Sequence, residues 1–233
     1  MLKLIMALSR TSRIAFIHPA EKVFLSILPI IIIGFTHRSI PVILNIIIFI
    51  LLHILCKNNR SIVIKFAFEI AAFAAISSIT FILDYGINYC GVVILKSLSA
   101  GLCLSFFALT TPIDDVLNIM AKNEWLKDMC DVAKTMERFL VVINDEYSIL
   151  YNSIKSRGGF DNFKLKITNT GKMAGLLFVN TMHRWKSIKD GIDSRCYRGY
   201  MPYLVKEFDF SYLRMGSISI YIFSLAMLIY MKV

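Results

Sequence analysis

The sequence has 233 residues, of which 57% are hydrophobic, and its mean hydropathy is +0.64. This apolar content exceeds the roughly 45–50% of an average soluble domain and excludes an ordinary soluble protein. The formal net charge of +10 raises the question of a nucleic-acid partner, but most of the cationic excess lies in loops beside apolar blocks, where anionic lipid headgroups are the simpler partner. We therefore expect a lipid bilayer and no nucleic acid.

Five apolar blocks predict an all-α polytopic membrane protein with about five transmembrane helices. A membrane-spanning helix needs about 20 apolar residues, because it rises 1.5 Å per residue across about 30 Å of hydrocarbon. Two of the blocks approach or exceed that length, while the first block is short and contains Pro29, and the second and last blocks need residues from their flanks. The blocks comprise residues 24–35, 40–56, 62–83, 92–109 and 218–231.

The distribution of Lys and Arg predicts a cytoplasmic amino terminus in the cell membrane. With that orientation only Arg38 and Lys232 fall outside, as the positive-inside rule favours. The predicted domains are then a membrane region with four spans, a cytoplasmic module and a last transmembrane helix, at residues 1–110, 111–213 and 214–233. The cations placed inside are Lys3, Arg10, Arg13, Lys22, Lys57, Arg60 and Lys65.

Catalytic and metal-binding patterns are missing from the sequence. The four histidines are far apart and form no HExxH pair, and the five cysteines include no CxxC pair. We expect no catalytic residue, no metal site and no cofactor in this chain. Lys65 and Glu69 lie four residues apart in the third apolar block, a spacing that predicts a structural ion pair on one helical face.

The polar module begins with "TTPID" at 110–114, which predicts a helix start with Thr111 as N-cap and Pro112 at the first helical position. A long amphipathic helix follows, because apolar residues recur at steps of three and four. It ends at Ser156-Arg157-Gly158-Gly159, where glycine predicts a left-handed cap. The apolar stripe consists of Met129, Val132, Ala133, Met136, Leu140, Ile143, Tyr147, Leu150 and Ile154.

A second amphipathic helix is predicted over residues 172–194, with Phe178, Met182 and Trp185 on its apolar face. It also ends with a serine and an arginine, in Ser194-Arg195-Cys196. Cations favour helix C-termini without any partner, and this accounts for one such arginine. Two similar ends favour a second explanation, in which each guanidinium enters an acidic groove and holds a carboxylate bidentately.

These features resemble the T component of energy-coupling factor transporters, and the cobalt-type CbiQ family in particular. The resemblance covers nearly the whole chain. "SRIAFIHPAEKVFL" at 12–25 is similar to the family's D-P-R-x-K approach to the first span, with His18 and Ala20 in place of the Asp and Arg. "LTTPIDDVLNIM" at 109–120 resembles its T-T-P helix entry.

The two helix ends resemble the family's Ala-Arg-Gly or Ala-Arg-Ser motifs, with the arginine kept in both. The resemblance implies that these ends dock in two cytoplasmic ABC ATPase subunits, which bind the ATP, and that the apolar faces contact a separate substrate-binding membrane subunit. The implied ATPase-coupling residues are Ser156, Arg157, Gly158, Ser194, Arg195 and Cys196. The implied membrane-subunit interface consists of Met136, Leu140, Ile143, Tyr147, Leu150, Met182 and Trp185.

The chain is thus expected to be a non-catalytic coupling subunit of an ATP-driven importer for cobalt or another micronutrient. The alternative is a conventional ABC permease that binds its substrate itself. A membrane-embedded enzyme would need polar catalytic residues at one bilayer depth, and a channel would need a polar stripe through several spans. Neither pattern is present in the sequence.

Overall fold

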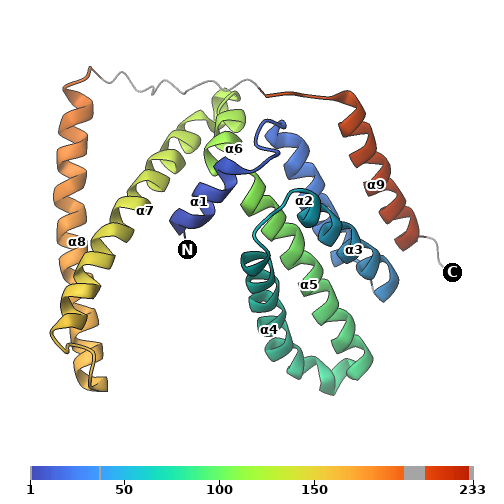
Figure 1. The fold of residues 1–233 in the computed structure, drawn as a ribbon, viewed down its shortest axis with the longest axis horizontal. Coiled ribbons are helices and arrows are strands. Elements are labelled where there is room, and N and C mark those ends of the chain that lie inside the picture. Colours follow the sequence, from blue (N-terminus) through green and yellow to red (C-terminus); the bar gives the residue numbers. More distant parts are fainter. Residues whose placement is uncertain (1, 37, 197–207, 231–233) are drawn as a thin grey trace. The chain divides into compact units, whose positions relative to one another are not determined.

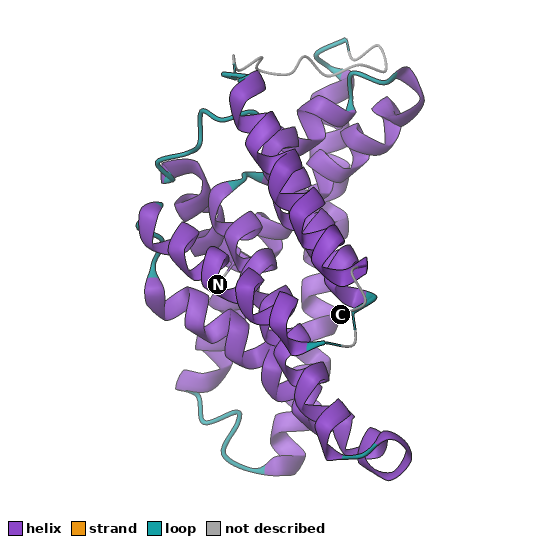
Figure 2. Cartoon of the chain, turned by 90° about the vertical axis from the view of Figure 1, so that its right-hand side faces the viewer, coloured by secondary structure: helices purple, strands orange, loops and turns teal. Residues whose placement is uncertain are grey.

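The computed structural model of the protein describes residues 2–36, 38–196 and 208–230. All regular elements in these ranges are α-helices (Figure 2), apart from one isolated parallel bridge between Ile17 and Asp209. The all-α class is therefore confirmed. The chain divides into two compact units, residues 1–119 with 206–233, called the membrane unit, and residues 120–205, called the hairpin unit. The predicted boundaries at 110 and 213 concern where the chain leaves the bilayer, and they stay predictions.

The membrane unit contains seven of the helices in the described part of the chain (Figure 1). Polar or glycine-containing turns separate them, as the sequence blocks indicate. The predicted helix start at Thr111 is displaced, because Thr111 caps the end of the preceding helix and the next one begins after Pro112. The helices are α1 (Leu2–Thr11), α2 (Pro19–Gly34), α3 (Ser39–Leu55), α4 (Arg60–Tyr85), α5 (Ile87–Thr110), α6 (Ile113–Met120) and α9 (Tyr212–Tyr230).

Three helices of the described chain are long and apolar enough to cross a membrane, over Arg60–Ile79, Tyr89–Thr110 and Tyr212–Tyr230. They correspond to the predicted blocks at 62–83, 92–109 and 218–231, although Met231 lies outside the described residues. Helix α3 has 17 residues and α2 has 16, near or below the lower limit of about 17 for a span. The protein is therefore a polytopic membrane protein, and the count of five spans stays a prediction.

The core of the membrane unit forms where α3 packs on the antiparallel pair of α4 and α5 (Figure 1). Phe49 and Phe106 meet there edge to face, with ring centroids 5.8 Å apart. Gly101 allows α4 and α5 to approach closely, since a Cβ at this position would lie 3.2 Å from the Cα of Ala67. Small residues at helix contacts are typical of membrane bundles.

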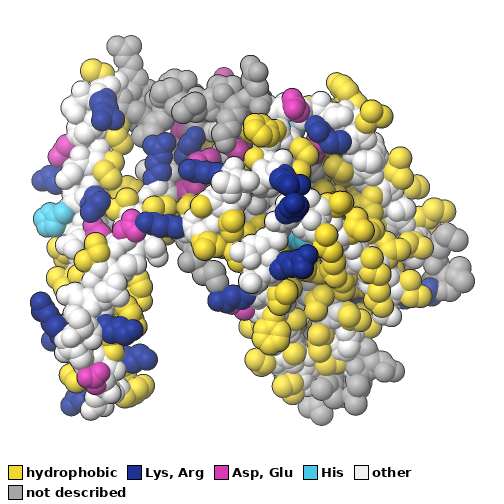
Figure 3. All heavy atoms as spheres, in the orientation of Figure 1, with side chains coloured by type: hydrophobic (Ala, Val, Ile, Leu, Met, Phe, Trp, Pro, Cys, Tyr) yellow, Lys and Arg dark blue, Asp and Glu magenta, His cyan; other side chains and the backbone are white. Residues whose placement is uncertain are grey.

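Large apolar side chains cover much of the visible surface of the membrane unit (Figure 3). Phe68 and Phe73 on α4 are 71% and 75% exposed, and Phe223 on α9 is 71% exposed. In water such a surface would be unfavourable, whereas hydrocarbon chains can cover it. Lys65 and Glu69 of α4 form the predicted pair, with Nζ and Oε1 3.9 Å apart.

One buried polar cluster crosses the apolar interior of this unit. The amide of Asn45, which is fully buried, donates to Ser99 Oγ at 2.7 Å and to Cys103 Sγ at 3.4 Å. Its carbonyl oxygen accepts a hydrogen bond from the hydroxyl of Tyr221. Asn45 therefore links α3 to both α5 and α9 with directional bonds, which apolar packing alone does not provide.

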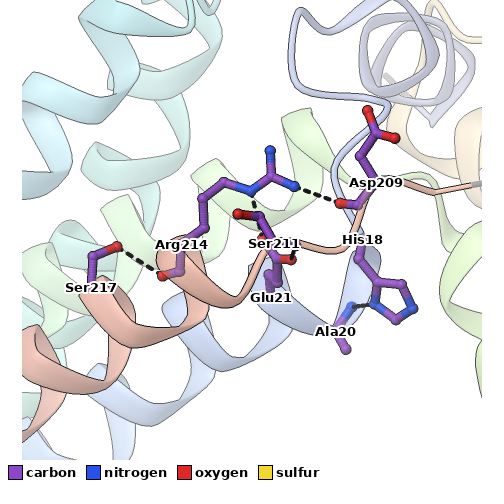
Figure 4. Close-up of polar contacts among 7 residues, drawn as sticks. All are labelled: His18, Ala20, Glu21, Asp209, Ser211, Arg214 and Ser217. Carbon is purple, nitrogen blue, oxygen red and sulfur yellow. Dashed lines mark hydrogen bonds and ion pairs between the residues drawn. The ribbon is translucent and has the colours of Figure 1, made fainter.

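A second polar contact joins the start of α2 to the start of α9 (Figure 4). The side chain of Glu21 is only 2% exposed, and its two oxygens accept hydrogen bonds from the backbone N–H of Ser211 and from Nε of Arg214, both at 3.1 Å. Arg214 also donates to the carbonyl oxygen of Asp209 at 2.5 Å. His18 begins α2 by accepting a hydrogen bond from the N–H of Ala20 at 3.2 Å.

The hairpin unit consists of α7 (Glu124–Ser156) and α8 (Phe163–Asp193). The predicted long helix is confirmed, but α7 begins five residues before Met129. Helix α8 begins nine residues before the predicted start at Lys172, because the amide of Asn169 bonds to the carbonyl of Gly159 and fixes this first part of α8 against the preceding turn. The sequence analysis missed this part of the helix, because polar and β-branched residues at 164–170 interrupt the apolar pattern.

Replacing the buried carboxylate should loosen the attachment of α9. We expect Glu21→Ala to lower the free energy of unfolding by roughly 1–3 kcal/mol, because two hydrogen-bond donors lose a buried acceptor. Thermal unfolding of the detergent-purified chain measures this. The control is Arg10→Gln, which breaks the exposed 2.7 Å pair of Arg10 with Asp114 and should cost less than about 1 kcal/mol. Equal losses in both variants would contradict the role given to Glu21.

Candidate functional site

The C-terminus of α7 has the left-handed cap that the sequence predicts. Gly158 has φ +68°, and its N–H donates to the carbonyl of Lys155 at 3.1 Å, while the N–H of Gly159 donates to the carbonyl of Ile154 at 3.0 Å. These two bonds are those of a Schellman motif, which satisfies carbonyls that the helix leaves free. Arg157 occupies the C-cap position immediately before the left-handed residue.

The C-terminus of α8 has a similar turn around Arg195, although its C-cap residue is Ser194. Cys196 follows with φ +56°, and its N–H donates to the carbonyl of Asp193 at 3.1 Å. The N–H of Arg195 donates to the carbonyl of Ile192 at 3.1 Å. A left-handed conformation costs a residue with a side chain about 1–2 kcal/mol that glycine avoids, so the same turn is strained here.

The two ends share a sequence pattern, Ile-x-Ser-Arg followed by a left-handed residue, at 154–158 and 192–196. The hydroxyl groups of Ser156 and Ser194 each donate to the carbonyl three residues earlier, at 3.0 and 3.1 Å. Each serine therefore satisfies a carbonyl of the last helical turn. Both arginines stand directly before a left-handed residue, Arg157 as the C-cap of α7 and Arg195 one residue after the C-cap of α8.

The guanidinium groups of Arg157 and Arg195 are exposed, and neither forms a hydrogen bond or an ion pair with a described residue. Arginine stays charged at every physiological pH and can bind a carboxylate through two parallel N–H donors. Each group is therefore available to a partner outside this chain.

The two arginines lie far apart, although their local structures match. Helices α7 and α8 are joined by a short turn, in which Asn169 Nδ2 donates to the carbonyl of Gly159 at 2.8 Å. Arg157 therefore lies near the beginning of α8, and Arg195 follows its end. At 1.5 Å per residue, the 31 residues of α8 place the two sites about 46 Å apart, too far for one binding groove.

Side-chain contacts hold the hairpin together. Arg184 of α8 pairs with Glu146 of α7 at 2.5 Å, and the Glu146 side chain is only 15% exposed. Tyr151 stacks on Tyr147 and on Phe160, with ring centroids 5.8 and 5.0 Å apart. Since Phe160 belongs to the connecting turn, this stack holds the turn against α7.

The predicted membrane-subunit interface divides into exposed and half-buried residues. Ile143 and Leu150 are half-buried, so part of each is already covered within this chain. The other members are 42–59% exposed and leave their apolar surface free. They are Met136, Leu140, Tyr147, Met182 and Trp185.

The exposed apolar surface of α7 extends further than the sequence analysis indicated. Trp125 is 93% exposed, and Met129 and Val132 are 70% and 60% exposed. Together with Met136 and Leu140 they continue one stripe at steps of three and four, which keeps them on one helical face. The polar neighbours of Trp125 concealed it, although its spacing of four from Met129 was a usable signal.

The thiols of the hairpin unit differ in their accessibility. Cys130 is 2% exposed, and burial raises the pKa of its thiol, with the neighbouring Asp131 raising it further. Cys196 is exposed and lies beside Arg195.

Among the described residues, no group of three or more His, Cys, Asp or Glu side chains is placed to hold a metal ion.

Comparison with known proteins identifies a family that covers most of the chain and relatives that cover parts of it. Residues 2–204 match the model of the CbiQ family, described as cobalt transport protein. The chain is 31% identical over 109 residues to a protein described as a fused cobalt transport protein, CbiMQ, of Methanocorpusculum labreanum, covering 46% of this chain and 18% of the relative. It is 26% identical over 99 residues to an uncharacterized protein of Methanocaldococcus jannaschii, covering 42% of this chain and 37% of the relative.

The turn after Arg157 should not tolerate a side chain at its second glycine. A Cβ at Gly159 would lie 2.4 Å from Ile154 Cγ2 and 2.9 Å from the Ile154 carbonyl oxygen. We expect Gly159→Ala to destabilise the hairpin by roughly 1–3 kcal/mol, seen as faster proteolysis within residues 157–163. Gly175→Ala is the control, because a Cβ there meets nothing within 4 Å and alanine favours a helix by about 1 kcal/mol. Unchanged proteolysis in Gly159→Ala would disprove the packing.

Proposed function

Because the chain belongs to the CbiQ family of cobalt transport proteins, we propose that it is the transmembrane coupling subunit of an energy-coupling factor importer. In this role it binds two cytoplasmic ABC ATPase subunits and a separate substrate-binding membrane subunit. It transmits the movement of the ATPases to that subunit and catalyses no reaction itself. The transported substrate is cobalt or another micronutrient, and the ATP is bound by the partner subunits.

The observation that carries this proposal is the repeated arginine cap. Arg157 and Arg195 each follow Ile-x-Ser and precede a left-handed residue, and their guanidinium groups are exposed and form no ion pair with a described residue. Their separation of about 46 Å along α8 fits two subunits, each of which receives one helix end. Acidic grooves would complement these ends, since a buried Arg–carboxylate pair is both strong and directional.

Exposed apolar residues on α7 and α8 support the proposed contact with a substrate-binding membrane subunit. Met136, Leu140 and Trp185 keep about half of their area exposed, at 59%, 50% and 53%. Covering apolar area yields roughly 25 cal/mol per Å², so a membrane subunit that lies on these faces would gain affinity. Methionine adapts to several packing arrangements, which suits a contact that must move during transport.

The arrangement of the cations supports a cytoplasmic amino terminus. Arg10 pairs with Asp114, and Arg13 and Lys57 line one cavity. The end of α1, the α3–α4 turn and the end of α5 therefore lie at the same end of the membrane unit. Cations gathered at one membrane face favour the cytoplasmic side, which is also where the ATPase subunits would be.

Removing either arginine should weaken the complex with the ATPases. We expect Arg157→Ala and Arg195→Ala each to lower the affinity by roughly 2–5 kcal/mol, because the acidic partner keeps its desolvated charge without a counter-ion. Affinity is measured by pulling the ATPase subunits down with the detergent-purified chain, and coupled uptake is measured in vesicles.

The matched controls are Lys155→Ala and Lys189→Ala, which remove a cation near the same helix ends. They should retain binding, because neither lysine stands directly before the left-handed residue. A protein that carries both Arg→Ala substitutions and still assembles and transports at the normal rate would overturn the proposal.

The apolar stripe should be needed for the membrane partner and not for the ATPases. We expect Met136→Asp or Trp185→Asp to reduce co-purification of the substrate-binding subunit at least about tenfold, since a carboxylate buried in an apolar contact is costly. Ser148→Asp on the exposed polar face of α7 is the control. Equal loss of ATPases and membrane subunit would indicate misfolding of the hairpin and would contradict a specific contact.

Mass spectrometry of the complex purified from its native membrane distinguishes this function from a conventional ABC permease. The coupling subunit should co-purify with two ATPase subunits and a second, substrate-binding membrane protein. A permease would bind the radiolabelled substrate without any other membrane protein, and that result would replace the proposed function.

A further inference from the structure

A cavity of 260 Å³ lies in the membrane unit between the end of α1, the α3–α4 turn and the end of α5. A single water needs roughly 10–15 Å³ of such volume, so the cavity can hold a much larger polar group. Its lining is basic and polar, and no described carboxylate belongs to it. The lining residues are Leu8, Thr11, Ser12, Arg13, Cys56, Lys57, Asn58, Asn59 and Leu109.

Two cations face the cavity without a counter-ion. Arg13 and Lys57 are exposed, and their side chains form no ion pair or hydrogen bond with any described residue. The nearby Arg10 differs from these two cations, because it has a counter-ion in Asp114. Both cations line the same cavity, and an anion bound there would be attracted to both charges.

The backbone at Lys57 is strained. Its φ is +52°, and its N–H donates to the carbonyl of Ile54 at 3.1 Å, while the N–H of Asn58 donates to the carbonyl of His53 at 3.2 Å. These bonds form a Schellman cap at the end of α3, in which the left-handed position is normally glycine. A lysine that remains at a sterically unfavourable position beside a cavity points to a function for its charge.

Polar groups around the cavity could complete the binding of an anion. The hydroxyl of Ser12 is buried and has no hydrogen-bond partner among the described residues, which is costly unless a ligand accepts a hydrogen bond from it. Asn58 and Asn59 contribute amide groups to the same wall. A phosphate group has enough acceptor oxygens for these donors and two cations.

We propose that this cavity binds the phosphate group of an anionic phospholipid headgroup. The candidate spans in α4 and α5 begin at Arg60 and end at Thr110, so the cavity lies where hydrocarbon gives way to headgroups. Leu8 and Leu109 provide an apolar side for the glycerol and upper acyl chain. The inference needs only a membrane location and does not depend on ATPase coupling.

Native mass spectrometry of the full-length chain in detergent tests the site, with phosphatidylglycerol as the probe. We expect wild-type protein to retain the lipid, and Arg13→Gln or Lys57→Gln to weaken retention about fivefold each, the effect of one cation near an anionic lipid. A galactolipid, which has the chains but no phosphate, should be retained weakly by all three proteins.

Arg60→Gln is the matched control, because Arg60 lies at the same membrane face and does not line the cavity. It should leave retention unchanged. Equal loss in Arg60→Gln, or equal retention of the galactolipid, would overturn the site. Inorganic phosphate distinguishes the two sources of the ligand: displacement of the lipid by millimolar phosphate would assign the cavity to free phosphate and overturn the lipid proposal.

Lys57→Gly keeps the test decisive if the glutamine variants fold poorly. Glycine accepts the left-handed conformation without strain, so the variant should have a higher thermal midpoint than wild type in lipid-free detergent. It should still lose phosphatidylglycerol, because the ammonium group is gone. A variant that gains stability and retains the lipid at the wild-type level would contradict the role of Lys57.

Discussion

The membrane unit depends on the buried carboxylate of Glu21, which joins the start of α2 to the start of α9. Both of its oxygens are occupied, one by the backbone of Ser211 and one by Arg214. A buried charge is tolerated only when its partners are in place, so the starts of α2 and α9 have to come together as the unit folds. The bond bridges 193 positions of sequence, and the entire hairpin unit lies between these positions.

The proposed sites are concentrated where helices end. A helix leaves its last carbonyls without partners, and in the described part of the chain Lys57, Gly158 and Cys196 adopt left-handed conformations at such ends. The tight turn projects a neighbouring basic side chain away from the helix, as at Arg157 and Arg195. A helix interior would spread such side chains around its circumference, whereas a cap presents one of them at a defined point. The chain uses this geometry in both units.

The sequence predicted local features well and long-range features poorly. The apolar blocks and the glycine cap at Gly158 follow from composition and from backbone preferences that operate over a few residues, and both are confirmed. The early start of α8 depends on Asn169 bonding back across the turn, and the Glu21–Arg214 contact depends on tertiary packing. Neither of these two contacts leaves a periodic pattern in the sequence. Lys57 was unpredictable for a different reason, because lysine is a poor left-handed residue and its presence there contradicts local preference. The roles of the site residues remain predictions, since they concern partner proteins.

The two arginine caps match in shape but differ in mechanical strength. Glycine holds the left-handed turn at Gly158 at no steric cost, whereas Cys196 stores about 1–2 kcal/mol of strain in the same turn. If ATPase subunits pull on the two guanidinium groups as proposed, the last turn of α8 should open more easily than the last turn of α7. An equal pull from the two proposed ATPase subunits would then displace the two ends of the hairpin unequally.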